Sequence, residues 1–361
     1  MRRVADVGIL ATGHDVADAR IHKIVDSLAR RGLSVELHGL GVAESGPVGA
    51  TVTASPRPGF MGRAMRALVL PWRTRAKVLF TVDPDAVPPA RLAAALRRQK
   101  VVVDLHEDYA KLLQDRPGLG GLARTLAVAT VKAATTLASG AALTVVADDH
   151  VPPLTARRRI VVRNEPVQRL LASPSDLDRE PRAVYVGDLR ASRGLFDMVD
   201  AIAAAPGWSL DLIGPVSPAD QQRLTERLAA ADLAGRVRLH GRRPPREAWE
   251  IVAGAWVGFA LLHDTPAFRD AVPTKLNEYV ASGLAVIVSD LPRQAEAVDQ
   301  AGAGTVVRNS AEAAGVLMDW MADREQLARY HAAARAWSRS FAPENGYDRL
   351  ADEVAALVVS S

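Results

Sequence analysis

The chain has 361 residues, of which 48% are hydrophobic, and it carries a formal net charge of +4. This length predicts two domains, since a single domain usually has roughly 100–200 residues, and the mild positive charge permits anionic partners without predicting nucleic-acid binding. Cysteine is absent, which excludes disulfides, thiolate metal sites and a thiol nucleophile.

The amino-terminal stretch does not predict a signal peptide, because Asp6 interrupts its apolar residues. No uninterrupted run of about 18 apolar residues predicts a transmembrane helix. We therefore expect a cytoplasmic protein.

The first half alternates short apolar runs with amphipathic segments, which is typical of a Rossmann-like domain. A polar loop with Gly13 is expected to follow the first run. No GxGxxG motif occurs, so a dinucleotide cofactor is not predicted. The predicted strands are residues 4–10, 34–39, 50–54, 78–82, 101–105 and 143–147.

Acidic residues follow two of these strands, at the edge of a parallel sheet where ligands bind. The sequence Asp83-Pro84-Asp85 favours a turn over a metal site, because two carboxylates alone are weak metal ligands and proline marks a turn. His106 closes the next strand beside acidic residues, whose charges can tune its pKa. It is therefore a candidate functional residue.

Residues 60–75 combine four arginines with Leu68, Val69, Leu70 and Trp72. We favour a surface helix that Pro71 breaks. The alternative is a basic interfacial patch that contacts anionic lipid, so peripheral attachment to the inner face of a membrane stays open.

A segment rich in proline, arginine, serine and aspartate separates the two halves. We expect a first domain at 1–165, a linker at 166–181 and a second domain at 182–340. A final helix at 343–361 is expected to pack back on the first domain. The second half repeats the alternation, with strands expected at 183–186, 210–213, 237–240, 256–262, 284–288 and 304–307.

The segment PTKLNEYVASGLAVIVSD, residues 273–290, predicts a loop, a short helix and a buried strand. Thr274 is the expected N-cap, and Gly283 is expected to end the helix in a left-handed conformation. The apolar run at 284–288 predicts a strand covered on both faces. The start of this helix then lies at the carboxyl edge of a parallel sheet and can bind a phosphate group.

Together these segments resemble a known family. DLHEDY, VRNEP, VYVGDLRASRGL, VRLHG and PTKLNEYVASGLAVIVSD occur in the order seen in retaining glycosyltransferases with two Rossmann-like domains, the GT-B fold. The family contains bacterial mannosyl- and N-acetylglucosaminyltransferases. The resemblance implies an α/β protein whose two domains face each other across a cleft.

The resemblance also implies roles for individual residues. Glu278 matches the acid that bonds the donor ribose, and Asp270 stands where the family has a glutamate that contacts the sugar. Arg193 matches a cation that neutralises the diphosphate, whereas Asp188 replaces the other cation and Arg190 is a substitute for it. Gly13 matches a glycine whose backbone closely approaches the donor and acceptor, and His106 matches a histidine that bonds the transferred sugar. Gly241 and Arg242 lie where the family's backbone contacts the nucleobase, and Thr274, Lys275 and Leu276 lie in the loop that binds the donor.

The implied reaction moves a sugar from a UDP- or GDP-linked donor to a saccharide, lipid-linked or small-molecule hydroxyl, with retention at the anomeric carbon and without a metal or cofactor. Arg193, His106 and Asp270 are the expected catalytic residues. Two alternatives remain: a nucleotide-sugar epimerase of the same fold, and a non-catalytic nucleotide-sugar-binding protein. The departures at Asp188 and Asp270 favour the second alternative.

Overall fold

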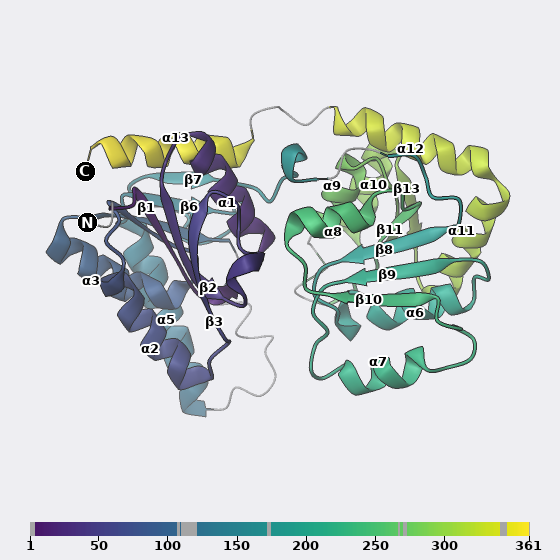
Figure 1. The fold of residues 1–361 in the computed structure, drawn as a ribbon, viewed down its shortest axis with the longest axis horizontal. Coiled ribbons are helices and arrows are strands. Elements are labelled where there is room, and N and C mark those ends of the chain that lie inside the picture. The colour runs from purple at the N-terminus through teal and green to yellow at the C-terminus, as the bar shows by residue number, and fades with distance from the viewer. Residues whose placement is uncertain are drawn as a thin grey trace. The chain divides into compact units, whose positions relative to one another are not determined.

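The structure is a computed structural model that describes residues 4–106, 109, 121–171, 175–265, 268–269, 273–339 and 345–360. It divides into two compact units, each with its own parallel sheet (Figure 1). The first unit comprises Met1–Asn164 with Glu344–Ser361, and the second comprises Glu165–Pro343. The expected α/β class is confirmed in both units.

Within the described residues, the first unit contains a seven-stranded parallel sheet with strand order β3-β2-β1-β4-β5-β6-β7. Hydrophobic side chains fill the inner strands, as expected for a sheet covered on both faces. The strands are β1 (Val7–Asp15), β2 (Val35–Leu40), β3 (Ala50–Ser55), β4 (Val78–Thr81), β5 (Lys100–Leu105), β6 (Leu143–Val146) and β7 (Arg159–Val161).

Helices cover both faces of this sheet (Figure 1). One layer contains α2 (Phe60–Arg73), α3 (Val87–Arg97) and α5 (Gly121–Ser139), in which α3 contacts both neighbours. On the other face, α13 (Gly346–Val359) packs against α1 (Ala19–Arg30). The last helix of the chain therefore belongs to the first unit.

Two local predictions in this unit were wrong. The expected polar loop at 11–18 is partly strand, because β1 continues to Asp15. Pro71 does not break α2, which ends only at Arg73. Proline is tolerated here because it lies in the last turn, and the amide of Thr74 still bonds to the carbonyl of Leu70.

In the described part of the second unit, six parallel strands follow the order β10-β9-β8-β11-β12-β13. The pairing of β11 with both β8 and β12 places the loops after these strands at one edge. The strands are β8 (Arg182–Val186), β9 (Ser209–Ile213), β10 (Val237–Gly241), β11 (Val257–Ala260), β12 (Ala285–Ser289) and β13 (Gly304–Val307).

Two apolar cores hold the second unit together. One packs Trp208, Trp256 and Leu317 between the sheet and α6 and α11, and the other packs Trp249 and Tyr279 under α8, α9 and α10. The helices are α6 (Leu195–Ala203), α7 (Gln221–Leu228), α8 (Pro245–Val252), α9 (Thr274–Ala281), α10 (Pro292–Ala301), α11 (Ser310–Ala322) and α12 (Arg324–Ser338).

The predicted strand–helix–strand unit around residues 273–290 is present as β11, α9 and β12. Gly283 has φ +80 after the C-cap of α9, so its predicted left-handed role is confirmed. The predicted N-cap was wrong: Pro273 is the N-cap, and Thr274 is already helical. Within the part of the chain that the structure describes, no side chain caps this end of the helix.

None of the helices in the described part of the chain combines the length and the apolar character needed to span a bilayer.

Candidate active site

In the second unit, the loop after β8 is shaped by two glycines. Gly187 has φ +137 and Gly194 has φ +76, a region that side chains rarely adopt. A Cβ on Gly194 would also collide with the backbone oxygen of Leu261, which follows β11. The amide of His263 donates to the carbonyl of Ser192 at 3.0 Å. These contacts fix Arg193 between the ends of β8 and β11.

Lys275 projects from the first turn of α9 toward this loop. Its side chain is only 8% exposed, and its Nζ lies 3.7 Å from the centroid of the Tyr185 ring. A Cβ on Gly187 would lie 3.0 Å from that nitrogen, so the glycine leaves room for it. Among the described residues, no hydrogen-bond acceptor contacts Lys275 Nζ. Burial, together with the charge of Arg193, holds the pKa of Lys275 well below its usual range.

Arg193 adds a second cation beside Lys275. Its Nε is buried without a hydrogen-bond partner in the described part of the chain, and its guanidinium lies 5.8 Å from the centroid of the Phe268 ring. Burial raises the pKa of Tyr185 to about 12, although the nearby Arg193 lowers it in part. Lys275 and Arg193 therefore both lie beside Tyr185, and neither Lys275 Nζ nor Arg193 Nε has a hydrogen-bond acceptor among the described residues.

The N-terminus of α9 points its free amides to the same place. The first amides of a helix have no intrahelical acceptor, and here no side chain of the described residues caps them. The helix dipole adds partial positive charge at this end. Glu278 lies one turn further along and is 7% exposed. Leu276 points away into the apolar core, so only its backbone can face the site.

Asp188, which replaces the expected cation, forms ion pairs with two arginines. Its carboxylate lies 3.1 Å from Arg190 Nη2 and 3.6 Å from Arg242 Nη2. Gly241 at the end of β10 has φ +66, which turns the chain toward this pair. The structure thus gathers Arg190, Arg193, Arg242, Lys275 and Glu278 at one edge of the second sheet. Asp270 lies outside the described residues.

The first unit carries a different polar cluster at the carboxyl edge of its sheet. Asp83 is 2% exposed. It accepts hydrogen bonds from the amide of Gly13 at 2.9 Å and from Arg63 Nη2 at 3.2 Å, and it lies 3.0 Å from His14 Nδ1. Burial would raise the pKa of Asp83, but His14, Arg63 and the Gly13 amide hold it well below its usual range.

Arg63 and Asp85 complete this cluster. Arg63 Nε donates to Asp85 Oδ2 at 2.7 Å, and the hydroxyl of Thr12 donates to Asp85 Oδ1 at 2.6 Å. A Cβ on Gly13 would lie 2.6 Å from Cζ of Arg63, so the glycine admits this guanidinium. The predicted turn at Asp83-Pro84-Asp85 is present as a short 3-10 helix at Pro84–Ala86. Its acids also bind the arginine, which the sequence did not reveal.

His106 lies next to this cluster. Its ring contacts that of His14 edge to face with 4.9 Å between centroids, and its Nε2 is 3.3 Å from the Tyr109 hydroxyl. Behind it, Asp104 forms a buried bidentate pair with Arg20, with both distances 2.7 Å. The two first-unit residues predicted for the site, Gly13 and His106, thus lie on either side of His14. Across the described residues, no group of three or more His, Cys, Asp or Glu side chains is placed to hold a metal ion.

Comparisons with known proteins give a family model and a fold. Residues 170–337 match the family model of Glycosyl transferases group 1. No curated protein matches the sequence of this chain.

Solved structures share the whole architecture. Sucrose-phosphate synthase from Thermosynechococcus elongatus is 16% identical with a TM-score of 0.69, covering 99% of this chain and 100% of that chain. Anabaena Alr3699/HepE in complex with UDP and glucose is 16% identical with a TM-score of 0.67, covering 98% and 99%. WaaG, a glycosyltransferase of lipopolysaccharide biosynthesis, is 15% identical with a TM-score of 0.67, covering 96% and 99%. The chain therefore has the GT-B fold, and its residues 170–337 are similar to the Glycosyl transferases group 1 family.

Proposed function

We propose that the protein transfers a sugar from a nucleoside-diphosphate-sugar to a hydroxyl acceptor, with retention at the anomeric carbon. The observation that carries the proposal is Lys275: a buried amine that no hydrogen-bond acceptor contacts among the described residues, beside Arg193 and the start of α9. An unpaired buried cation is costly, so a site that keeps one is suited to an anionic ligand. A diphosphate supplies that anion.

In this proposal the diphosphate occupies the space between Lys275 and the loop after β8. Arginine matches phosphate oxygens with two parallel donors, and the first amides of α9 add neutral ones. These groups stabilise the negative charge that grows on the leaving diphosphate as the glycosidic bond breaks. The side chains supply this charge themselves, so we propose a reaction that requires no metal.

The remaining donor contacts follow from the surrounding elements. The buried carboxylate of Glu278 can accept hydrogen bonds from both ribose hydroxyls. The turn at Gly241 and Arg242 offers backbone groups to the nucleobase. Asp270 keeps its proposed contact with the sugar. The HepE structure contains UDP and glucose, which supports a UDP-linked donor, with a GDP-linked one as the alternative.

The first unit supplies the acceptor side of the proposal. Its cluster of Asp83, Asp85, His14 and Arg63 offers fixed donors and acceptors suited to a neutral hydroxyl compound. His106 contacts the transferred sugar. The leaving phosphate takes the acceptor proton on the face from which it departs, so no separate side chain need serve as the base.

Transfer assays with Arg193→Ala and Glu278→Ala test the proposal. We expect Arg193→Ala to lose about 100-fold or more in turnover, the usual effect of removing one group that stabilises a transition state. Glu278→Ala should lower the rate at limiting donor concentration, because it removes the proposed contact with the donor ribose. Arg246→Ala and Glu250→Ala form the matched control, because this exposed pair lies on α8 of the same unit. Near-normal rates in both site variants would refute the assignment.

Product analysis separates the alternatives. A transferase forms a glycoside with some member of an acceptor panel, whereas an epimerase returns a changed nucleotide-sugar. Asp188, in the place of a family cation, specifically favours a binding protein without activity. Tight nucleotide-sugar binding without turnover on any acceptor would support that second function.

A further inference from the structure

Helix α2 of the first unit carries an apolar stripe on its outer face. Phe60, Met61, Met65, Leu68 and Trp72 recur at helical spacing, and their exposed fractions run from 37% for Trp72 to 79% for Met61. Isolated apolar side chains on a surface are ordinary, but five on one helix form a contiguous patch. The neighbouring α3 adds exposed Leu92 and Leu96.

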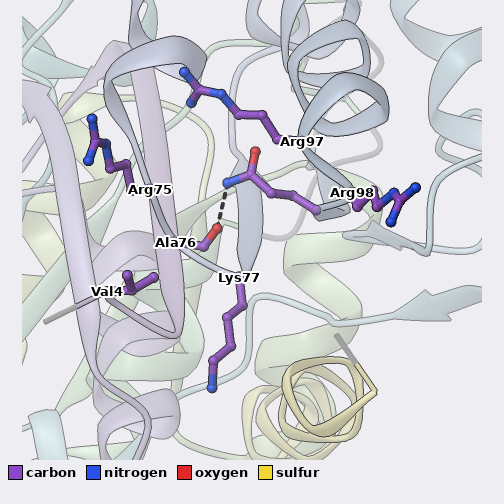
Figure 2. A pocket seen from close by; sticks show the side chains of 7 residues that line it. Val4, Arg75, Ala76, Lys77, Arg97 and Arg98 are labelled. Atoms are coloured by element: carbon purple, nitrogen blue, oxygen red, sulfur yellow. Dashed lines mark hydrogen bonds between the residues drawn. The ribbon is translucent and has the colours of Figure 1, made fainter.

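Cations lie beyond the carboxyl end of this stripe. From residue 46 to residue 82 the sequence contains no aspartate or glutamate. Beyond the end of α2, a hollow of about 500 Å³ is lined by Arg75, Lys77, Arg97 and Arg98 (Figure 2). In the described part of the chain, Lys77 pairs with Asp6, whereas no acid pairs with Arg75 or Arg98.

Arg97 joins the hollow to the stripe. Its Nη2 donates to the carbonyl of Trp72 at 2.9 Å, and its guanidinium lies 5.3 Å from the centroid of the Trp72 ring. Tryptophan is suited to the boundary between lipid headgroups and acyl chains, because one part of its ring system is apolar and the other is polar. The apolar stripe and the cationic hollow therefore form one continuous surface.

We propose that this surface, α2 with the hollow formed by Arg75, Lys77, Arg97 and Arg98, docks on an anionic membrane. The side chains of the stripe enter the boundary of the acyl region, and Arg75 and Arg98 bind phosphate-bearing headgroups. A protein partner would have to match an apolar helix and a group of cations at once, whereas an anionic bilayer presents both chemistries everywhere. The proposal does not depend on the donor or the acceptor of the reaction.

Co-sedimentation of the full-length protein with vesicles tests the surface. We expect binding to vesicles that contain phosphatidylglycerol, little binding to phosphatidylcholine alone, and release by salt. Met61→Ser/Met65→Ser/Leu68→Ser should abolish most of the binding. Because each arginine contributes about fivefold near an anionic surface, Arg75→Gln/Arg98→Gln should weaken binding by about tenfold or more. Arg157→Gln/Arg349→Gln, which removes the same charge from the same unit, should leave it unchanged.

Trp72 provides an independent readout. The other tryptophans of the chain are buried or half-buried, so brominated lipids should quench Trp72 selectively. The Trp72→Phe variant should lose this quenching and still sediment with the vesicles.

Three results would overturn the proposal. Equal binding to neutral and anionic vesicles would remove the role of the cations, and sedimentation without quenching of Trp72 would place the contact elsewhere. A dimer in solution that dissociates in the triple serine variant would show that the stripe binds a second copy.

Discussion

The carboxyl edges of the two sheets differ in whether their charged side chains are paired. In the first unit, Asp83 and Asp85 are both paired, with Arg63 bridging them. In the second unit, Lys275 is buried without an acceptor among the described residues, and Arg193 lies beside it. At the first edge the acids and the arginine pair with one another, whereas at the second edge the Lys275 amine has no hydrogen-bond acceptor among the described residues.

The difference teaches what each edge can bind. A satisfied network is rigid and presents fixed hydrogen-bonding groups, but it gains little from a charged ligand. A buried cation without a hydrogen-bond acceptor destabilises the free protein, and its interaction with a bound anion contributes strongly to the free energy of binding. Stability and binding should therefore respond in parallel to changes at the first edge and in opposite directions at the second.

Lys275→Met gives the largest expected effect. It directly tests whether stability and donor binding change in opposite directions at the second edge. Methionine fills a similar space without a charge, so the variant should gain about 1–3 kcal/mol of stability by removing an unpaired buried group. It should also lose about 100-fold in turnover, because one cation at the diphosphate is missing. Thermal unfolding with and without UDP, and a transfer assay, measure both changes.

The pH dependence of this gain has a defined sign. Burial lowers the pKa of folded Lys275 from its ordinary value of 10.5, so folding releases a proton and the wild type loses stability as pH falls below that value. The advantage of the methionine variant should therefore vanish above about pH 10 and grow toward neutrality. Lys132→Met on the exposed face of α5 is the control and should show neither effect. A less stable Lys275→Met protein would mean that the ammonium is paired after all.

Asp83→Asn tests the first edge, where stability and function should fall together. The amide cannot carry the charge that His14 and Arg63 neutralise, and we expect a loss of about 1–3 kcal/mol. The loss stays moderate because Arg63 retains Asp85. Chemical denaturation measures it.

The direction of the pH dependence of this stability loss follows from the pKa of Asp83. Folded Asp83 has a pKa below its ordinary value of 3.8, so its contribution is complete above that value and is lost as pH falls through the folded pKa. The difference between wild type and variant should shrink below about pH 4. Asp352→Asn, which removes an exposed partner of Arg31, should leave stability unchanged. An equally stable Asp83→Asn protein would show that the cluster is not an energetic unit.

Much of the second edge could be predicted from the sequence because its determinants are local. Apolar runs mark buried parallel strands, and Gly283 ends α9 because a left-handed residue is needed there. The resemblance to glycosyltransferases supplied Arg193 and Glu278. The burial of Lys275 could not be predicted from the sequence, because it depends on Tyr185 and Gly187, which lie about ninety residues away in the chain.

The first edge was harder to predict for the same physical reason. Asp83 bonds to Gly13 and His14, which are separated from it by 70 and 69 residues, so only the folded sheet brings them together. Two local predictions about single residues in helices also failed. Pro71 stays inside α2, and Thr274 does not cap α9, because position in a helix matters more than residue type.

Asp188→Asn has the smallest expected effect and probes the acid that contacts Arg190 and Arg242 at the edge of the second sheet. Asparagine keeps an oxygen for Arg190 but removes a negative charge near the proposed diphosphate. Exposed ion pairs contribute about 0–1 kcal/mol, so stability should change within that range. The same energy corresponds to a rise of up to about fivefold in UDP affinity, which calorimetry would detect.

The outcome decides why an acid stands at this position. If affinity rises and the rise disappears in high salt, Asp188 opposes the anion through its charge and restrains donor binding. If affinity falls, Asp188 instead orients Arg190 and Arg242, whose contacts with it are 3.1 and 3.6 Å. Asp232→Asn, which removes an exposed partner of Arg227, should leave affinity unchanged. An unchanged affinity in Asp188→Asn as well would place the diphosphate away from the loop after β8, and the cations of Lys275 and Arg193 would then need another ligand.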